Sequence, residues 1–198
     1  MEGTMKICYY GHSCFTLSCC DFTIALDPYD TSVPGYPVLD IAADAVYCSH
    51  GHFDHNYTAA VRLSGTDKEN PFKVSEYQIP HDKEGGSKRG MNFIRVFECC
   101  GKKVIHMGDT GCIPGPEILK ALEGADALLI PVGGFFTIDA AEAKQVAETI
   151  KPAMVIPMHY RNGASGLPMI ASLQDFLDVC SGSGLKICPL EYGQAVEI

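Results

Sequence analysis

Basic residues and long hydrophobic runs are both scarce in this sequence. It has 15 Lys and Arg residues against 24 Asp and Glu residues, which gives a formal net charge of −9. No basic stretch exceeds a doublet such as Lys88-Arg89, so a protein that binds by neutralising many phosphates is not expected. No apolar stretch approaches the roughly 18 residues of a membrane helix, and the first residues lack the apolar core of a secretory signal. We therefore expect a cytoplasmic protein with no nucleic-acid or membrane partner.

The cysteines lack the spacing of a familiar metal or redox motif. Ten cysteines in 198 residues fall below the roughly 8–10% that marks a disulfide scaffold, and no pair has C-x-x-C spacing. Two pairs are adjacent in sequence, Cys19-Cys20 and Cys99-Cys100, and each lies beside a predicted strand. We interpret most of the cysteines as reduced, small core residues in a reducing cytosol.

The composition indicates one folded domain. Hydrophobic residues make up 46% of the chain and charged residues 20%, far from the composition of disordered proteins. No linker, charge block or low-complexity segment divides the chain, so residues 1–198 are expected to form a single domain.

The hydrophobic periodicity predicts two halves, each with strands followed by helices. Strands are expected at residues 5–10, 13–17, 22–26, 44–49, 72–78, 92–98, 103–107, 127–132, 153–157 and 185–188, and helices at residues 56–63, 116–122, 139–150 and 170–179. The first three strands predict an antiparallel meander. In a chain of this size the pattern favours two sheets packed face to face with helices outside.

A histidine cluster follows the predicted strand at residues 44–49. His50, His52, Asp54 and His55 form the pattern H-x-H-x-D-H. Burying so many polar groups without partners is costly, and a metal ion would satisfy them. Their spacing differs from the helical H-E-x-x-H of zinc peptidases and favours two adjacent metals over one.

Further donors follow other predicted strands. His81, Asp109 and His159 each come just past a strand end, where loops gather at one edge of a sheet. Two cations need more ligands than one short segment provides, and these side chains are the expected source. Two divalent cations would generate a hydroxide that attacks a carbonyl or phosphoryl centre.

This order of residues resembles the metallo-β-lactamase-fold superfamily over essentially the whole chain. The local strings look like its small metal-dependent hydrolase branch related to ascorbate-6-phosphate lactonase. Those strings are Gly11-His12-Ser13, Pro80-His81-Asp82, His106-Met107-Gly108-Asp109-Thr110-Gly111 and Pro157-Met158-His159-Tyr160.

The resemblance implies a four-layer αββα sandwich of two mixed sheets with a binuclear metal site at the sheet edge. It further implies that His50, His52 and His81 hold one metal, that Asp54, His55 and His159 hold the other, and that Asp109 bridges them. Asp54 and Asp109 are then the predicted catalytic residues. Zn²⁺ is the favoured metal, and Mn²⁺ or Fe²⁺ suit the same donors.

Several roles stay open at this point. His12 and His106 could line the site or serve as structural residues. The loop at residues 85–90 could be a hairpin or a lid that carries Lys88 or Arg89, and Arg161 could be a substrate clamp or a solvated charge.

The expected activity is hydrolysis of an ester, lactone or phosphate bond in a small, anionic metabolite. The alternative is a nuclease-type phosphodiesterase of the same fold. A homo-oligomer is compatible with either activity.

Overall fold

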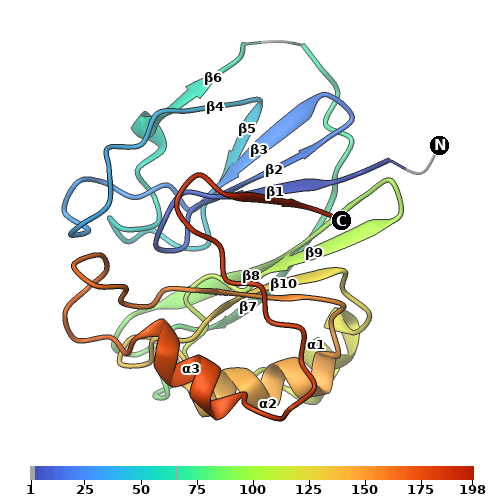
Figure 1. Cartoon of the computed structure of the whole chain (residues 1–198). Helices are drawn as coiled ribbons and strands as arrows, with labels where there is room; N and C mark the ends of the chain where they lie inside the picture. The colour runs from blue at the N-terminus through green and yellow to red at the C-terminus, as the bar shows by residue number, and fades with distance from the viewer. Residues whose placement is uncertain (1–2, 66) are drawn as a thin grey trace.

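Two five-stranded sheets lie face to face and enclose the main core. The computed structural model describes residues 3–65 and 67–198. Figure 1 shows the two sheets as separate layers, with the α-helices on the far side of the second sheet. The sandwich predicted from the sequence is confirmed.

The first sheet is formed by amino-terminal strands, and the carboxyl-terminal strand forms one of its edges. Its order is β12 (Ala195–Glu197), β1 (Lys6–Tyr9), β2 (Phe15–Cys19), β3 (Phe22–Leu26) and β5 (Ala45–Tyr47). β1, β2 and β3 are antiparallel neighbours, as the meander predicted, and β3 pairs in parallel with β5.

The second sheet carries most of the helices. Its order is β11 (Val155–Met158), β10 (Ala127–Pro131), β9 (Lys102–His106), β8 (Met91–Cys99) and β7 (Lys73–Pro80). β9, β10 and β11 are parallel, which requires crossover connections, and helices supply two of them. The helices are α1 (Pro116–Leu122), α2 (Ala140–Ile150) and α3 (Leu173–Val179). Within the described ranges, no helix is both long and apolar enough to cross a membrane.

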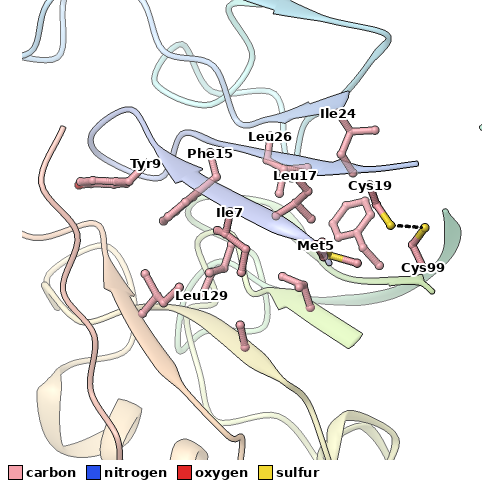
Figure 2. Close-up of a cluster of buried hydrophobic side chains, with 14 of the residues drawn as sticks. Met5, Ile7, Tyr9, Phe15, Leu17, Cys19, Ile24, Leu26, Cys99 and Leu129 are labelled. Carbon is pink, nitrogen blue, oxygen red and sulfur yellow. Dashed lines mark hydrogen bonds between the residues drawn. The ribbon is translucent and has the colours of Figure 1, made fainter. Parts of the chain in front are cut away.

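Three apolar clusters hold the layers together. The cluster between the sheets includes Ile7, Leu17, Phe97 and Leu129, and Figure 2 shows part of it. A second cluster joins the other face of the second sheet to α1, α2 and α3. A third cluster covers the outer face of the first sheet. Most of its buried residues lie between Tyr29 and Val61.

The expected helix at residues 56–63 is wrong. The structure has a short 3₁₀ helix, η1 (Thr58–Ala60), and then β6 (Val61–Leu63), which pairs in parallel with β4 (Ile41–Ala43). Tyr57 precedes η1 and makes no side-chain cap, whereas the β-branched Val61 is buried as part of the third cluster. Tertiary pairing therefore outweighs local helix preference, and this small sheet covers the first sheet in place of an α-helix.

Other boundaries also shift. The expected strand at residues 185–188 is reduced to a single bridge between Ile187 and Val155. The helix expected at residues 170–179 begins at Leu173, because the Ser172 side chain accepts a hydrogen bond from the Asp175 backbone N–H and caps it. The short strands β4 and β12 were not predicted.

We expect the core between the sheets to be sensitive to truncation at Phe97. This side chain is fully buried and its ring meets that of Tyr47 edge to face, with 5.5 Å between centroids. Phe97→Ala should lower the free energy of unfolding by about 3–5 kcal/mol, since it removes buried area and leaves a cavity. Urea denaturation measures this loss, and Val38→Ala, on a 74% exposed side chain, should change it by no more than about 0.5 kcal/mol. Equal effects of the two substitutions would contradict this packing.

Candidate metal centre

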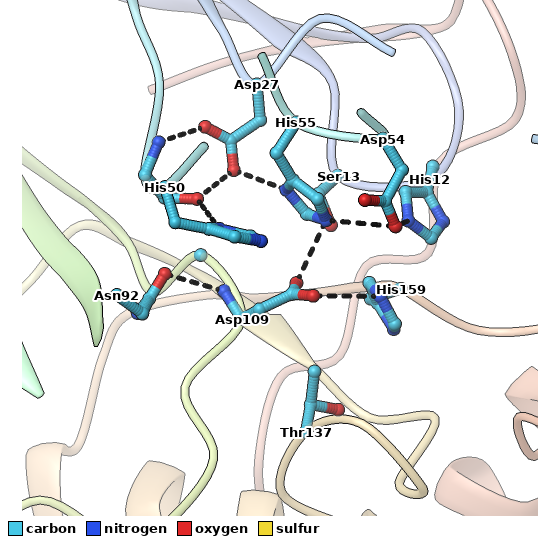
Figure 3. A network of polar contacts seen from close by, with 12 residues as sticks. His12, Ser13, Asp27, His50, Asp54, His55, Asn92, Asp109, Thr137 and His159 are labelled. Carbon is cyan, nitrogen blue, oxygen red and sulfur yellow. Dashed lines mark hydrogen bonds and ion pairs between the residues drawn. The ribbon is translucent and has the colours of Figure 1, made fainter. Parts of the chain in front are cut away.

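Loops from both sheets meet at one end of the sandwich. His12 lies in the β1–β2 turn, and the H-x-H-x-D-H segment follows β5 of the same sheet. His81, Asp109 and His159 come after β7, β9 and β11 of the second sheet. The carboxyl ends of these strands share one edge, so the polar side chains converge there, as Figure 3 shows for most of them.

Asp109 lies at the centre of the converging side chains. Its Oδ1 is 3.2 Å from Nε2 of His55, and its Oδ2 is 3.3 Å from Nε2 of His81 and 3.2 Å from Nε2 of His159. The Asp109 backbone N–H donates to Oδ1 of Asn92 at 2.9 Å, which orients the residue from behind. One carboxylate thus contacts imidazole rings from both sheets.

The possible ligand atoms fall into overlapping groups. In each group the atoms lie within 4.8 Å of one another. The groups are His50 with His52 and His81; His12 with Asp54, His55 and His159; and His50 with His55 and Asp109. The structure therefore brings together all seven side chains named as metal ligands in the sequence analysis, and it adds His12 to them.

Several buried donor and acceptor atoms in this group have no hydrogen-bond partner. They are His12 Nδ1, His50 Nε2, His55 Nε2, His81 Nδ1, Asp109 Oδ1 and both ring nitrogens of His159. Leaving so many polar atoms unpaired in the interior is costly, and metal coordination would satisfy the Asp109 oxygen and one nitrogen of each ring that acts as a ligand. The residues present therefore fit divalent metal ions.

Asp27 holds two of these rings in position, and the sequence analysis did not identify it. Its Oδ2 accepts a hydrogen bond from Nδ1 of His55 at 2.7 Å. The Ser49 hydroxyl also donates to Asp27, so the same hydroxyl must accept from Nδ1 of His50 at 3.0 Å. Both rings are thus held through Nδ1, which leaves Nε2 as the nitrogen that a metal ion would take.

The electrostatics favour positive charge near Asp109. Burial lowers the pKa of His55, but the neighbouring carboxylates Asp109 and Asp27 outweigh it and raise that pKa well above its ordinary value. Burial and the neighbouring His55 lower the pKa of His50 to about 3. Burial and His159 lower that of His12 to about 4. His50 and His12 are thus held neutral, the protonation state that a metal ligand needs, whereas the two carboxylates favour the protonated form of His55, which a metal ion would have to displace.

The backbone is in the left-handed region at three residues of the site. His12, Asp27 and His159 have φ values of 53°, 45° and 52°. Such values are uncommon for residues other than glycine, although asparagine, aspartate and histidine adopt them more often than the rest, and they gather at functional sites. Gly108 has a φ of 53° and lies so close to Asn92 that a Cβ there would clash with its Oδ1. The loops therefore adopt an unfavourable backbone conformation at these residues, and this conformation places the side chains of His12, Asp27 and His159 in the site.

His106 does not face the possible ligands. Its Nε2 donates to the Ser13 carbonyl at 2.9 Å, and its Nδ1 accepts from the Gly108 backbone N–H at 3.2 Å. Both ring nitrogens are used, so His106 ties the second sheet to the loop that carries His12. This is one of the two roles left open for it.

A cavity of about 360 Å³ opens beside the site. It is lined by His52, Phe53, Asp54, His81, Arg89, Asp109, Phe136, Leu167 and Met169. Arg89 is the cation of this lining, and its guanidinium lies over the Phe136 ring at 5.1 Å. Arg161 is exposed and is not part of the lining.

Asp82 organises the loop that carries Arg89. Its carboxylate accepts four backbone N–H groups, from Glu84, Gly86, Lys88 and Arg89, at 2.8–2.9 Å. Burial raises the pKa of Asp82, but these hydrogen bonds, that of Arg89 first, lower it to about 2. Lys88 itself pairs with Glu84 at 2.6 Å. The loop is thus a compact turn that presents Arg89 to the cavity.

The sequence is similar to known members of one protein superfamily. Residues 6–159 match the family described as beta-lactamase superfamily domain. A curated relative, the UPF0173 metal-dependent hydrolase of Thermoplasma acidophilum, is 30% identical over 187 residues, which cover 79% of this chain and 83% of the relative.

Two solved structures resemble the chain over most of its length. A protein of Thermotoga maritima, titled as a Zn-dependent hydrolase of the metallo-β-lactamase superfamily, is 29% identical with a TM-score of 0.73, covering 93% of this chain and 97% of its own. The metallo hydrolase Igni18 of Ignicoccus hospitalis is 21% identical, with a TM-score of 0.77 and 98% coverage of both chains. The second likeness shows the fold alone.

We predict that Asp27 contributes to metal affinity without being a ligand. Asp27→Asn keeps the shape of the side chain but weakens its hold on His55 and Ser49. Metal affinity should fall by about 10- to 100-fold, as for other residues that orient a metal ligand. Competition with a chromogenic chelator measures the affinity.

The matched control is Asp40→Asn. Asp40 is exposed and pairs with Arg62 at 2.9 Å on the outer surface. It should bind metal like the wild type. Unchanged affinity in Asp27→Asn would show that the ring orientation does not depend on this carboxylate.

Proposed function

Since the chain belongs to the beta-lactamase superfamily and is a metal-dependent hydrolase, we propose that it works with a binuclear metal site on a small, anionic metabolite. The bond cleaved would be an ester, lactone or phosphate bond. The observation that carries this proposal is the position of Asp109, whose two oxygens face His55, His81 and His159 at 3.2–3.3 Å.

The residues around Asp109 divide naturally into two ligand sets. In the proposed site, His50, His52 and His81 hold one ion and Asp54, His55 and His159 hold the other, while Asp109 contributes to both. Divalent ions supply Lewis acidity, which makes water nucleophilic near neutral pH and polarises the bond to be cleaved. Zn²⁺ is proposed because mixed imidazole and carboxylate donors suit it and because the Thermotoga maritima relative is titled as Zn-dependent.

Asp54 would orient the attacking water and receive its proton. Its carboxylate lines the cavity, and its Oδ2 lies 3.2 Å from Nε2 of His12. Burial raises the pKa of Asp54, but the hydrogen bond from His12 and the nearby His55 lower it overall, so the carboxylate stays ionised. His12 is buried behind Asp54 and would act as its positioning residue.

The cavity lining supports a substrate with an apolar part and an anionic group. Phe53, Phe136, Leu167 and Met169 form apolar walls, and Arg89 supplies positive charge away from the ligand cluster. Arginine suits this role because its planar guanidinium can donate two hydrogen bonds to a carboxylate or phosphate. We assign the proposed clamp to Arg89 and not to Arg161.

A small molecule is favoured over a nucleic acid. The volume of about 360 Å³ is typical of small-molecule pockets, and the net charge of −9 opposes a polyphosphate backbone. The nuclease-type phosphodiesterase stays the alternative. The cytoplasm is the proposed compartment, because a chain with ten cysteines and no C-x-x-C or disulfide-scaffold pattern suits reducing surroundings.

The binuclear site predicts the effect of removing Asp109. The His/Asp site should hold close to two metal ions per chain, so Asp109→Ala should carry about two ions fewer than the wild type and abolish hydrolysis, because both ions share this carboxylate. Elemental analysis after gel filtration measures the content. Asp178→Ala, on an exposed carboxylate of α3, is the control and should keep the wild-type content. Full metal occupancy in Asp109→Ala would exclude the proposed bridge.

The clamp predicts a selective change in substrate affinity. Arg89→Ala should raise KM for an anionic substrate by about 10- to 100-fold, equivalent to the roughly 1.5–3 kcal/mol of a hydrogen bond to a charged group. KM for a neutral ester, and the metal content, should stay near the wild-type values. Arg161→Ala is the control and should behave like the wild type in a panel of neutral and anionic esters, lactones and phosphodiesters. If neutral substrates are preferred and Arg89→Ala changes nothing, the anionic part of the proposal is wrong.

A further inference from the structure

Four cysteine sulfurs meet at the end of the sandwich opposite the candidate metal centre. Cys19 and Cys20 lie at the β2–β3 turn of the first sheet, and Cys99 and Cys100 at the β8–β9 turn of the second. The four Sγ atoms all lie within 4.8 Å of one another. Figure 2 shows the inner pair, Cys19 and Cys99, pointing toward each other from the two sheets. The cluster therefore joins the sheets at this end.

The two turns are bent so that adjacent cysteines point to the same place. In an extended strand, neighbouring side chains point to opposite faces. Here Cys20 and Cys100 have φ values of 52° and 50°, in the left-handed region that β-turns normally fill with glycine, asparagine or aspartate. These conformations bring the sulfur of Cys20 to 3.7 Å from that of Cys19, and the sulfur of Cys100 to 3.8 Å from that of Cys99. An unfavourable backbone at both turns points to a role for the sulfurs.

The sulfur distance within each adjacent pair suits coordination by one ion. A tetrahedral Zn²⁺ ion with Zn–S bonds of about 2.3 Å places its sulfurs about 3.75 Å apart, which agrees with the distance within each adjacent pair. Across the sheets the distances are 2.8 Å for Cys19 and Cys99 and 3.0 Å for Cys20 and Cys100. Both exceed the disulfide bond length of about 2.05 Å. Tetrahedral coordination would require these two distances to lengthen by about 0.8–1 Å, through separation of the two turns.

We propose that Cys19, Cys20, Cys99 and Cys100 form a second metal site, a closed tetrathiolate site for Zn²⁺ with a structural role. Each cysteine loses its proton to the solvent on coordination. A four-sulfur ligand set leaves no open position for substrate, so the site would clamp the two sheets and take no part in hydrolysis. It is independent of the proposed activity.

The surroundings favour a negatively charged metal–thiolate group. Lys6 and Lys68 line the same surface hollow as Cys19 and Cys20, and Nζ of Lys68 donates to the Asp21 carbonyl in the β2–β3 turn at 2.7 Å. Four thiolates around a divalent ion carry a net charge of −2, which these ammonium groups would offset in part, since Asp21 lines the same hollow and Nζ of Lys68 also lies 3.7 Å from Oδ1 of Asp44. The backbone at Gly3 passes so close that a Cβ there would lie 2.8 Å from Sγ of Cys100. This contact shields one side of the cluster from water.

Two disulfides between the same turns would bring little benefit. A disulfide stabilises mainly by closing a loop in the unfolded chain. Once Cys19 and Cys99 were joined, a bridge between their neighbours Cys20 and Cys100 would close almost no further loop. A single ion, in contrast, requires all four sulfurs at one point, and this is how the turns present them.

The experiment uses full-length protein purified without chelators. The variant Cys20→Ser/Cys100→Ser changes the two exposed cysteines and leaves the buried pair. It should carry about one zinc ion less per chain than the wild type by elemental analysis. After exchange with Co²⁺, it should lose the thiolate-to-cobalt charge-transfer absorption, which histidine and carboxylate ligands do not produce. The control Cys8→Ser/Cys188→Ser removes two partly buried cysteines outside the cluster and should keep both signals.

Two further measurements make the result independent of the variant's folding and of the histidine site. Zinc X-ray absorption of the wild type should show sulfur neighbours at about 2.3 Å. The thiolate-to-cobalt absorption should persist in Asp109→Ala, so failure of the binuclear proposal would leave this one standing. Zinc with only nitrogen and oxygen neighbours, or a mass under non-reducing conditions that shows the four cysteines joined as disulfides, would overturn the proposal.

Discussion

The buried carboxylate of Asp109 constrains the rest of the molecule, because it must meet side chains supplied by both sheets at distances of 3.2–3.3 Å. His55 comes from a loop of the first sheet, and His81 and His159 come from the second. A shift of one sheet relative to the other would open these contacts. Burial of Asp109 would otherwise raise its pKa, but His159 and His55 hold that pKa well below the ordinary value, so the carboxylate stays charged and needs positive partners. The two sheets must therefore keep a fixed spacing at this end, and the packing of residues such as Leu17 and Leu129 between them provides it.

Much of the site could be predicted because its chemistry is local in sequence. H-x-H-x-D-H places four polar groups within six residues, and His81, Asp109 and His159 each follow a hydrophobic strand whose end is visible in the hydrophobic pattern. Asp27 occupies an equivalent position after β3, but a single aspartate followed by proline carries no distinguishing pattern in an acidic chain. Its role depends on where His55 and Ser49 return in space, and periodicity does not contain that information.

The errors in the fold have the same origin. Residues 56–63 have an acceptable helical pattern, yet Val61 pairs with Ile41, on the far side of β5 in the sequence, and is buried there. The bridge of Ile187 to Val155 likewise replaces a strand that local composition favoured. The adjacent cysteine pairs were interpreted as ordinary core residues because the two pairs are separated by 80 positions in the sequence. The predicted meander already placed Cys20 in a turn, and the pairing of β2 with β3 confirms it. Only the face-to-face packing of the two sheets shows that this turn meets the β8–β9 turn.

The position of the two sheets at the cysteine end affects their position at the histidine end. At the histidine end, left-handed backbone at His12, Asp27 and His159 persists only where the surrounding structure holds it. The strands that lead into this end, β2 and β9, begin or end near Cys19 and Cys100 at the other. A link between the sheets at the cysteine end would limit their rotation about the hydrophobic core between them, and so limit the relative movement of the loops that carry the ligands. Because each strand is short, extended and hydrogen-bonded to its neighbours in the sheet, fixing one end of a strand limits the movement of its other end. The proposed thiolate site would in this way support the precision that Asp109 requires without touching the substrate.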